Sequence, residues 1–244
     1  MEQSTGGQRV AFFGGSFDPP HLGHLAVARA AHAALELDTV LFAPVGSQPL
    51  KPHGSTASFE DRLAMTRLAI AGVPGLSISL ADAPKPSGAP NYTLETLESL
   101  RAALPPGSSL FCLMGADSFL GLHRWRRADE IPFVAPLIVA SRPGQPLDGL
   151  RAALPSGLTI ETAPEAPLGT SAAKPEVRSY ILHNLARETS PFYLLPGLDV
   201  EISASQLRER IRDQVLAAPE TPAASHELLP KTVLEYIRSH GLYR

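Results

Sequence analysis

The stretch that most constrains this chain is a glycine and histidine motif directly after a short apolar run near the N-terminus. Val10–Phe13 is apolar enough for a buried strand, and the chain continues Gly14-Gly-Ser-Phe-Asp-Pro-Pro-His21-Leu-Gly-His24. An Ala- and Leu-rich stretch with helical spacing then runs to Leu35. A strand, a glycine turn and a helix start together present backbone N–H groups to phosphate. We therefore expect an anion-binding site at this turn, with the two histidines beside it.

Apolar runs suited to buried strands alternate with stretches suited to helices. After the strand at 10–13, strands are expected at 39–43, 76–80, 110–114 and 137–140, and helices at 22–35, 58–71 and 92–104. Such alternation predicts an α/β protein with a parallel sheet and right-handed crossovers. Ligands of these sheets bind beyond the carboxyl ends of the strands.

Polar clusters follow the predicted strands at four places. They are Gly14–His24, Lys51, Gly115–Ser118 and Arg142. Because the carboxyl ends of parallel strands meet at the same edge of a sheet, we expect these clusters to converge there.

The second half of the chain is less regular. Strands are expected at 158–161 and 192–195, and helices at 206–216 and 228–240. Two segments rich in Pro and Ala, 163–175 and 217–225, are predicted to be exposed loops. We divide the chain into a sheet domain, residues 9–200, and a C-terminal helical part, residues 201–244, which carries the second motif described below.

Composition narrows the class of protein. The formal net charge is −3 and neither half is strongly basic, so a dedicated nucleic-acid-binding protein is not expected. Cys112 is the only cysteine, which excludes a disulfide framework, favours a reducing compartment and predicts a core residue. Residues 1–8 lack an apolar signal core, and no apolar run reaches the ~18 residues of a membrane span. We expect a cytoplasmic protein without a membrane partner.

His21 and His24 lie three positions apart and share a face of the first helical turn. One interpretation is a helix start with one exposed and one hydrogen-bonded histidine. Another is a zinc site, but zinc needs three or four close ligands and no third is evident, so we predict no metal held by the protein. Phosphate binding fits better, because imidazole N–H donors add to the positive end of the helix.

Ile202-Ser-Ala-Ser205-Gln-Leu-Arg208 is a second candidate phosphate site. Ser203 or Ser205 is expected to cap a helix, with Arg208 one turn further along. By itself this pattern is typical of a capped surface helix. Paired with the first motif, it predicts a second helix start that grips phosphate, with Arg208 as an always-charged clamp.

Together the two motifs resemble those of the nucleotidylyltransferase superfamily, whose members have a Rossmann-like sheet. Further matches run along nearly the whole chain, at Asn91-Tyr-Thr93, at Met114-Gly-Ala-Asp117 with Trp125 shortly after, and at the tail Gly241-Leu-Tyr-Arg244. These resemble the nicotinate-nucleotide adenylyltransferase branch. The resemblance implies a doubly wound parallel sheet with a small C-terminal helical subdomain. It also implies transfer of AMP from ATP to nicotinate mononucleotide, giving deamido-NAD and pyrophosphate in NAD biosynthesis.

The resemblance further implies a role for each site residue. His21, His24 and Arg208 would be catalytic and hold ATP phosphates, with His24 nearest the reacting α-phosphate. The other ATP-binding residues would be Gly14, Gly15, Ser16, Phe17, Gly115, Asp117, Ser203 and Ser205. Thr93 and Trp125 would receive the nicotinate ring, while Lys51, or His53 beside it, and Arg142 would meet substrate phosphate. Mg²⁺ would be carried on the ATP phosphates.

Other functions account for less of the sequence. Phosphopantetheine adenylyltransferases and glycerol-phosphate cytidylyltransferases resemble the first motif only, and an aminoacyl-tRNA synthetase would need a Lys-rich second motif and a tRNA-binding region. An adenylyltransferase that prefers the nicotinamide substrate is a closer alternative. A nucleotide-binding regulator with an inactive site is disfavoured by the intact His21, His24 and Arg208. Whether the chain forms a homo-oligomer is left open.

Overall fold

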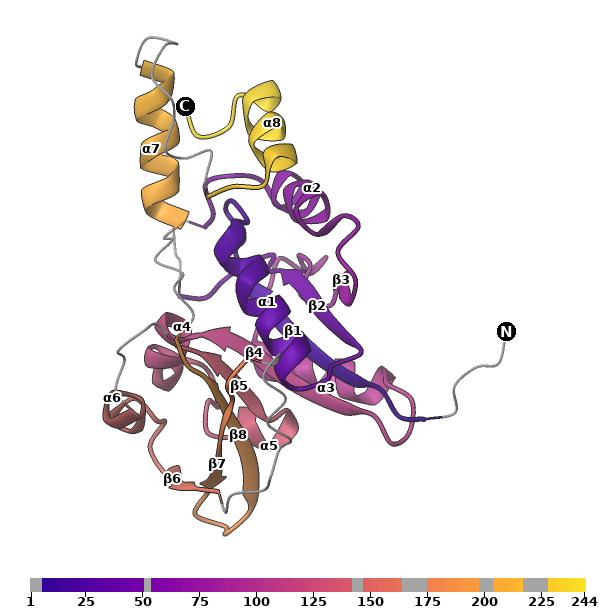
Figure 1. Ribbon diagram of the computed structural model, residues 1–244, viewed down its shortest axis with the longest axis vertical. Coiled ribbons are helices and arrows are strands. Elements are labelled where there is room, and N and C mark those ends of the chain that lie inside the picture. Colours follow the sequence, from indigo (N-terminus) through magenta and orange to yellow (C-terminus); the bar gives the residue numbers. More distant parts are fainter. Residues whose placement is uncertain (1–5, 51–53, 142–146, 164–174, 198–203, 217–227) are drawn as a thin grey trace.

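The computed structural model describes residues 6–50, 54–141, 147–163, 175–197, 204–216 and 228–244. Its strands are β1 (Arg9–Gly15), β2 (Thr39–Pro44), β3 (Leu76–Ile78), β4 (Ser109–Gly115), β5 (Leu137–Ala140), β6 (Thr159–Thr162), β7 (Arg178–His183) and β8 (Thr189–Leu195). Its helices are α1 (Leu22–Ala34), α2 (Phe59–Ile70), α3 (Thr93–Ala103), α4 (Ala116–Leu120), α5 (Ile131–Val134), α6 (Leu147–Ala152), α7 (Ala204–Leu216) and α8 (Lys231–His240), with a 3-10 turn η1 at Leu122–Arg124. Figure 1 shows their arrangement.

The strands form one eight-stranded sheet in the order β3-β2-β1-β4-β5-β8-β7-β6. The six strands from β3 to β8 in this order pair in parallel, which confirms the predicted parallel arrangement there. β7 is antiparallel to both of its neighbours, so the sheet as a whole is mixed. The sequence-based prediction missed β7. A short turn suffices to join antiparallel strands, so no helix separates β7 from β8 and the alternating pattern ends there.

Helices cover both faces of the sheet, because successive strand residues point to opposite sides. On β1, Ala11 and Phe13 belong to the buried cluster that contains side chains of α1, α2, α7 and α8. Val10 and Phe12 belong to the cluster built with α3, α4, α5 and α6. The doubly wound architecture is therefore confirmed.

The C-terminal helices pack against the N-terminal half of the chain rather than apart from it. Leu207 of α7 and Val233 of α8 share the buried cluster of Phe13, and in Figure 1 both helices lie at the upper end with α2. The backbone N–H of Leu22 donates to the carbonyl oxygen of Leu228 at 2.9 Å. The division into residues 9–200 and 201–244 stays a prediction.

Several local expectations can be compared with the structure. Ser58 caps α2, accepting from the Asp61 backbone N–H at 3.0 Å. The last helix begins at Lys231 rather than near 228, because Pro230 occupies its N-cap. Cys112 is buried as predicted, and burial raises the pKa of its thiol to about 12.

Most of the two predicted loops, 163–175 and 217–225, lies outside the described residues. Among the described residues, no helix combines the length and apolar composition of a membrane span.

The strand order has one reversal that matters for ligand binding. From β1 the chain proceeds outward to β3, then crosses back to β4 on the other side of β1. At such a switch point the crossovers diverge and leave a crevice beyond the carboxyl ends of the two strands. Here those ends are Gly15 and Gly115.

Candidate active site

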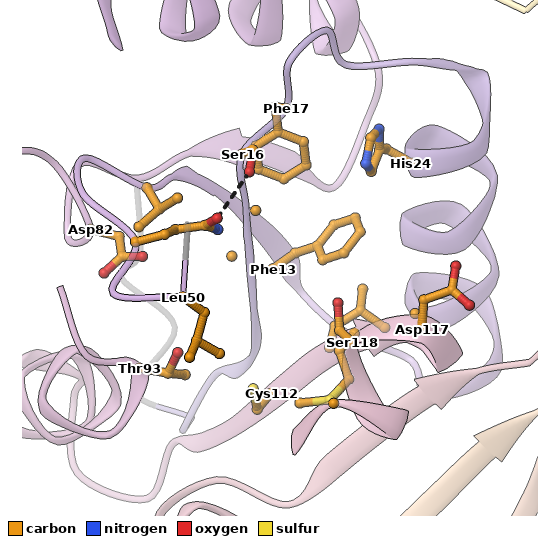
Figure 2. A pocket seen from close by; sticks show the side chains of 18 of the residues that line it. Phe13, Ser16, Phe17, His24, Leu50, Asp82, Thr93, Cys112, Asp117 and Ser118 are labelled. Atoms are coloured by element: carbon orange, nitrogen blue, oxygen red, sulfur yellow. Dashed lines mark hydrogen bonds between the residues drawn. The ribbon is translucent and has the colours of Figure 1, made fainter. Parts of the chain in front are cut away.

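A cavity of about 880 Å³ lies at the carboxyl ends of β1 and β4. The described residues expected from the sequence to form the site all line it: Gly14, Gly15, Ser16, Phe17, His21, His24, Thr93, Gly115, Asp117, Trp125, Ser205 and Arg208. The clusters Gly14–His24 and Gly115–Ser118 therefore converge, as predicted. Lys51, His53, Arg142 and Ser203 lie outside the described residues. Figure 2 shows Phe13, Phe17 and His24 on one side of the cavity, with Leu50, Asp82 and Thr93 across from them.

The loop after β1 is held in an unusual backbone conformation. Phe17 has φ +47°, a left-handed value that a non-glycine residue adopts at a cost in free energy. Its ring is buried between Phe13, at 5.6 Å between ring centroids, and His24, at 5.0 Å. Aromatic packing thus stabilises this loop conformation, and the Phe17 side chain belongs to the core. The loop is also tied across the cavity, where the Ser16 hydroxyl donates to Gln48 Oε1 at 3.3 Å (Figure 2).

His24 is held as a neutral hydrogen-bond donor. Its Nδ1 accepts from the backbone N–H of His21 at 3.2 Å, and the two rings stack at 3.7 Å between centroids. Burial, and then the neighbouring His21, lower the pKa of His24 well below its usual value. In a neutral imidazole whose Nδ1 accepts, the proton is on Nε2. His24 therefore offers an Nε2–H in the wall of the cavity.

One ring nitrogen of His21 lacks a hydrogen-bond partner among the described residues. Its side chain is buried, and burial lowers its pKa to about 4. Within the part of the chain that the structure describes, its buried Nδ1 has no hydrogen-bond partner. An unpaired buried polar atom costs free energy until a ligand or a water meets it. His21 lines the cavity with the rest of its ring, whereas this nitrogen is closed off from solvent.

The backbone N–H groups at the start of α1 are mostly engaged within the protein. That of Leu22 donates to Leu228, that of His24 donates to the His21 carbonyl at 3.0 Å, and that of His21 donates to His24. The expectation that helix-start amides meet phosphate is therefore wrong for these positions. The C-terminal segment supplies the acceptor for Leu22, so imidazole groups rather than these amides are the donors toward the cavity.

Arg208 comes to this end of the cavity from α7. Its Nη1 donates to the carbonyl oxygen of Asp18 at 2.7 Å, and its Nη2 donates to Ser205 Oγ at 3.1 Å. Ser205 lies inside the first turn of α7 rather than at its N-cap, and Ser203, the other residue expected as a cap, lies outside the described residues. The Ser205 hydroxyl accepts from the arginine that follows one turn later. The second motif thus fixes a guanidinium in place beside the first motif.

The opposite end of the cavity is more open. Thr93 begins α3, and Trp125, which follows η1, is only partly buried. The Arg126 guanidinium lies 4.6 Å from the centroid of the Tyr92 ring and donates to Glu95 at 3.1 Å. Thr93 and Trp125, distant in sequence, therefore line one cavity together, beside an exposed cation and a partly exposed aromatic ring.

Two supporting residues were missed by sequence reasoning. Arg62 of α2 is 2% exposed and donates to the carbonyl oxygens of Ser16, at 2.7 Å, and Val45, at 2.8 Å. It thereby ties the loops after β1 and β2 to each other, although burial lowers the pKa of its guanidinium. Asn91 likewise bridges two loops, accepting from Ser47 N–H at 3.1 Å. The sequence feature that could have indicated a buried Arg62 is its place on the same helical face as the apolar Met65 and Ala69.

The described residues contain no group of three or more His, Cys, Asp or Glu side chains placed to hold a metal ion. Asp18, the carboxylate within the first motif, is buried and accepts hydrogen bonds from the backbone N–H groups of Thr56, at 2.6 Å, and Ala57, at 3.1 Å. The cavity therefore offers imidazole and guanidinium groups, a donor set suited to anionic oxygen.

Comparison with known proteins gives consistent matches over nearly the whole chain. The family model described as cytidylyltransferase-like matches residues 12–210. A probable nicotinate-nucleotide adenylyltransferase of Roseiflexus sp. (strain RS-1) is 35% identical over 236 residues, covering 96% of this chain and 98% of the relative. One from Gloeobacter violaceus is 35% identical over 237 residues, covering 97% of each chain.

The fold also matches a solved structure. The nicotinic acid mononucleotide adenylyltransferase of Plasmodium falciparum, complexed with NaAD, has a TM-score of 0.66 at 14% identity, covering 97% of both chains. At that identity the likeness supports the fold alone, while the curated relatives and the family model carry the assignment. The chain therefore belongs to the cytidylyltransferase-like family, and within it to the nicotinate-nucleotide adenylyltransferases.

Proposed function

We propose that the protein transfers AMP from ATP to nicotinate mononucleotide, releasing pyrophosphate and forming deamido-NAD in NAD biosynthesis. One observation carries the proposal: a single cavity joins His21, His24 and Arg208 at one end to Thr93 and Trp125 at the other. Its volume of about 880 Å³ suits two nucleotides that meet in the middle. The names of the curated relatives support the same reaction.

The reaction requires little covalent chemistry from the protein itself. A phosphate oxygen of nicotinate mononucleotide, ionised at neutral pH, forms a bond to the α-phosphorus of ATP. The bond from that phosphorus to the bridging oxygen of the β-phosphate breaks, and pyrophosphate leaves with the electron pair. No general base is needed. Catalysis consists of aligning two anions that repel each other and stabilising the charge on the departing group.

The phosphate end supplies the groups for this task. His24 donates from Nε2–H to an oxygen of the α-phosphate, and His21, whose ring lines the same wall of the cavity, provides a second hydrogen bond. Arg208 and Ser205 grip the β- and γ-phosphates. Because the histidines are neutral at pH 7, they act by directed hydrogen bonds, and Arg208 contributes the positive charge.

The remaining roles complete the proposal. Gly14–Phe17 provides backbone contacts to ATP, and Gly115 and Asp117 line its ribose and adenine. Thr93 and Trp125 receive the nicotinate ring, with Trp125 stacked on it. Lys51 and Arg142 meet substrate phosphate, and Ser203 joins the grip of Ser205. Of these residues, the glycines, Phe17, Asp117, Thr93, Trp125 and Ser205 line the cavity, whereas Lys51, Arg142 and Ser203 lie outside the described residues.

Mg²⁺ belongs to the proposal as an ion carried by the substrate. The side chains of the cavity are compatible with a Mg²⁺ ion held by the substrate rather than by the protein. Its imidazole and guanidinium groups are donors for phosphate oxygen, and the Asp18 carboxylate already accepts from protein donors. When bound, Mg²⁺ neutralises part of the phosphate charge, held mostly by phosphate oxygen and water. We also propose a cytoplasmic protein without a nucleic-acid partner, supported by its single buried cysteine and net charge of −3.

The test is pyrophosphate release from Mg-ATP with nicotinate mononucleotide, nicotinamide mononucleotide or phosphopantetheine in parallel. We expect release to be fastest with the nicotinate substrate. Release only with another acceptor would retain the phosphate end and overturn the roles of Thr93 and Trp125. ATP binding without release from any acceptor would favour a nucleotide-binding regulator.

A further inference from the structure

The C-terminal tail, Gly241–Arg244, matches the family motif but has no part in the proposed chemistry. Both Gly241, at φ +63°, and Tyr243, at φ +64°, adopt left-handed backbone conformations, which turn the chain sharply after α8. Tyr243 is 6% exposed, and its hydroxyl donates to Asp18 Oδ1 at 2.7 Å. The tail thus returns to the loop that follows β1.

Asp18 is the residue at which three distant segments meet. Its buried carboxylate accepts from the Tyr243 hydroxyl and from the backbone N–H groups of Thr56 and Ala57. Its carbonyl oxygen accepts from Arg208 Nη1 at 2.7 Å. One residue therefore holds the tail through its side chain and the phosphate clamp through its main chain, with its carboxylate Oδ2 also 3.9 Å from Arg208 Nη1.

The Tyr243 hydroxyl is suited to a permanent donor role. Burial, and then the charge of Asp18, raise its pKa well above the usual value for tyrosine. The hydroxyl stays protonated throughout the physiological range and donates to a carboxylate, and hydrogen bonds to charged groups are the stronger kind. Asp18 itself is 4% exposed, so little solvent competes for this bond.

We propose that Tyr243 is a positioning residue for the phosphate clamp, acting through Asp18 to hold the Arg208 guanidinium where it meets a triphosphate. The identity of that ligand rests on the proposed function. Without the hydroxyl, Asp18 keeps its two backbone donors, but the loop after β1 loses its tie to the tail. The orientation of Arg208 then loosens, which weakens triphosphate binding and leaves the end of the cavity near Thr93 unaffected.

The experiment compares Tyr243→Phe with Tyr236→Phe. Both changes remove one hydroxyl from the C-terminal segment, and the Tyr236 hydroxyl also donates to a carboxylate, Asp61, at 3.0 Å, but lies outside the cavity lining. Calorimetry measures the Kd of an ATP analogue that cannot be cleaved between its α- and β-phosphates, in the presence of Mg²⁺. We expect Tyr243→Phe to raise this Kd about five- to tenfold. The KM for nicotinate mononucleotide should stay within about twofold of the unmodified protein, and Tyr236→Phe should change neither value.

A double-mutant cycle tests whether Tyr243 acts through Arg208. In an Arg208→Ala background, Tyr243→Phe should cause no further rise in the Kd of the ATP analogue. A rise in this Kd as large in the Arg208→Ala background as in the unmodified protein would overturn the proposal. An unchanged Kd in Tyr243→Phe, or a rise no larger than that of Tyr236→Phe, would overturn it as well. If Tyr243→Phe does not fold, Asp18→Asn, which keeps the side-chain volume and removes one carboxylate oxygen, is measured instead, and it should raise the Kd of the ATP analogue at least as much as expected for Tyr243→Phe, because it also removes the negative charge 3.9 Å from Arg208 Nη1. An unchanged Kd in that variant would overturn the proposal.

Failure of the proposed function is distinguishable in this design, because binding is read without turnover. An unmodified protein that binds the ATP analogue but releases no pyrophosphate overturns the proposed reaction and leaves the positioning role of Tyr243 supported if Tyr243→Phe binds more weakly. Normal turnover with unchanged analogue binding in Tyr243→Phe overturns the positioning role alone. An unmodified protein that does not bind the analogue overturns both.

Discussion

The two ends of the cavity are built differently. At the phosphate end, Phe17, Asp18 and His21 are buried, and their backbone or side-chain groups are held by specific packing and hydrogen bonds. At the opposite end, Trp125 is partly exposed and Arg126 pairs with Glu95 on the surface. Stabilising a developing charge requires donors that are fixed before the reaction, whereas holding an aromatic ring needs mainly apolar area. The difference in burial therefore matches a division between chemistry and recognition.

The largest effect is expected from the phosphate end. His24→Ala should lower kcat by ~10²–10³-fold at saturating substrates, the range for losing one preorganised donor. Pyrophosphate release under steady-state conditions measures it. His32→Ala is the matched control, since His32 lies in the same helix but outside the cavity lining, and it should retain full activity. Unchanged turnover in His24→Ala would remove that imidazole from the catalytic machinery.

The buried histidines also predict a pH dependence of stability. Burial lowers the pKa of His21 to about 4, against 6.5 in the unfolded chain. Below pH 6.5 the unfolded state binds the extra proton, so the free energy of unfolding falls as the pH drops toward 4. Above 6.5 both states are neutral and this contribution is constant. The expected slope is about 1.4 kcal/mol per pH unit for this residue.

Urea unfolding between pH 4.5 and 8 measures this slope. His21→Gln should reduce the slope relative to the unmodified protein, because glutamine does not titrate. Identical slopes in the two proteins would contradict the burial of a neutral His21.

A smaller effect is expected at the end of the cavity lined by Thr93 and Trp125, which we call the recognition end. Trp125→Ala should raise the KM for nicotinate mononucleotide by about two- to tenfold, the worth of one aromatic stacking contact, with little change in kcat. The KM for ATP should not change, which separates the two ends of the cavity. Trp125→Phe, which keeps a ring, should restore most of the affinity. If Trp125→Ala has an unchanged KM, the residue is an ordinary surface aromatic.

The smallest effect concerns the surface charges at that end. Lys85 pairs with Glu95 at 3.0 Å, and both side chains are exposed by more than a third, at 37% and 43%. Water and salt screen such a pair, so Lys85→Ala should leave the Tm unchanged within measurement error. Thermal melting at low and high salt measures this. A clear fall in Tm, abolished by salt, would mean that the recognition end depends on its ion pairs.

Much of the framework was predictable because its signals are local. The apolar run at β1 and the glycines after it indicate a strand and a turn wherever they occur, and helical spacing identified α1 and α2. β7 was missed because no helix separates it from β8, so the alternation of strands and helices that identifies the other strands ends there. The sequence did not decide between Ser203 and Ser205 as the cap, because a hydroxyl near a helix start has the same sequence signature whether it caps the helix or accepts from Arg208.

The sequence by itself determined the alternating strands and helices and both phosphate motifs, because each depends on residues within a few positions of one another. Only the tertiary structure decided how the motifs are joined. Asp18 and Tyr243 are 225 positions apart, and Arg208 reaches Asp18 across 190. No periodicity or spacing encodes such contacts. They exist because the helices α7 and α8 pack on the same face of the sheet as α1, which brings buried polar groups together where they must satisfy one another's hydrogen bonds.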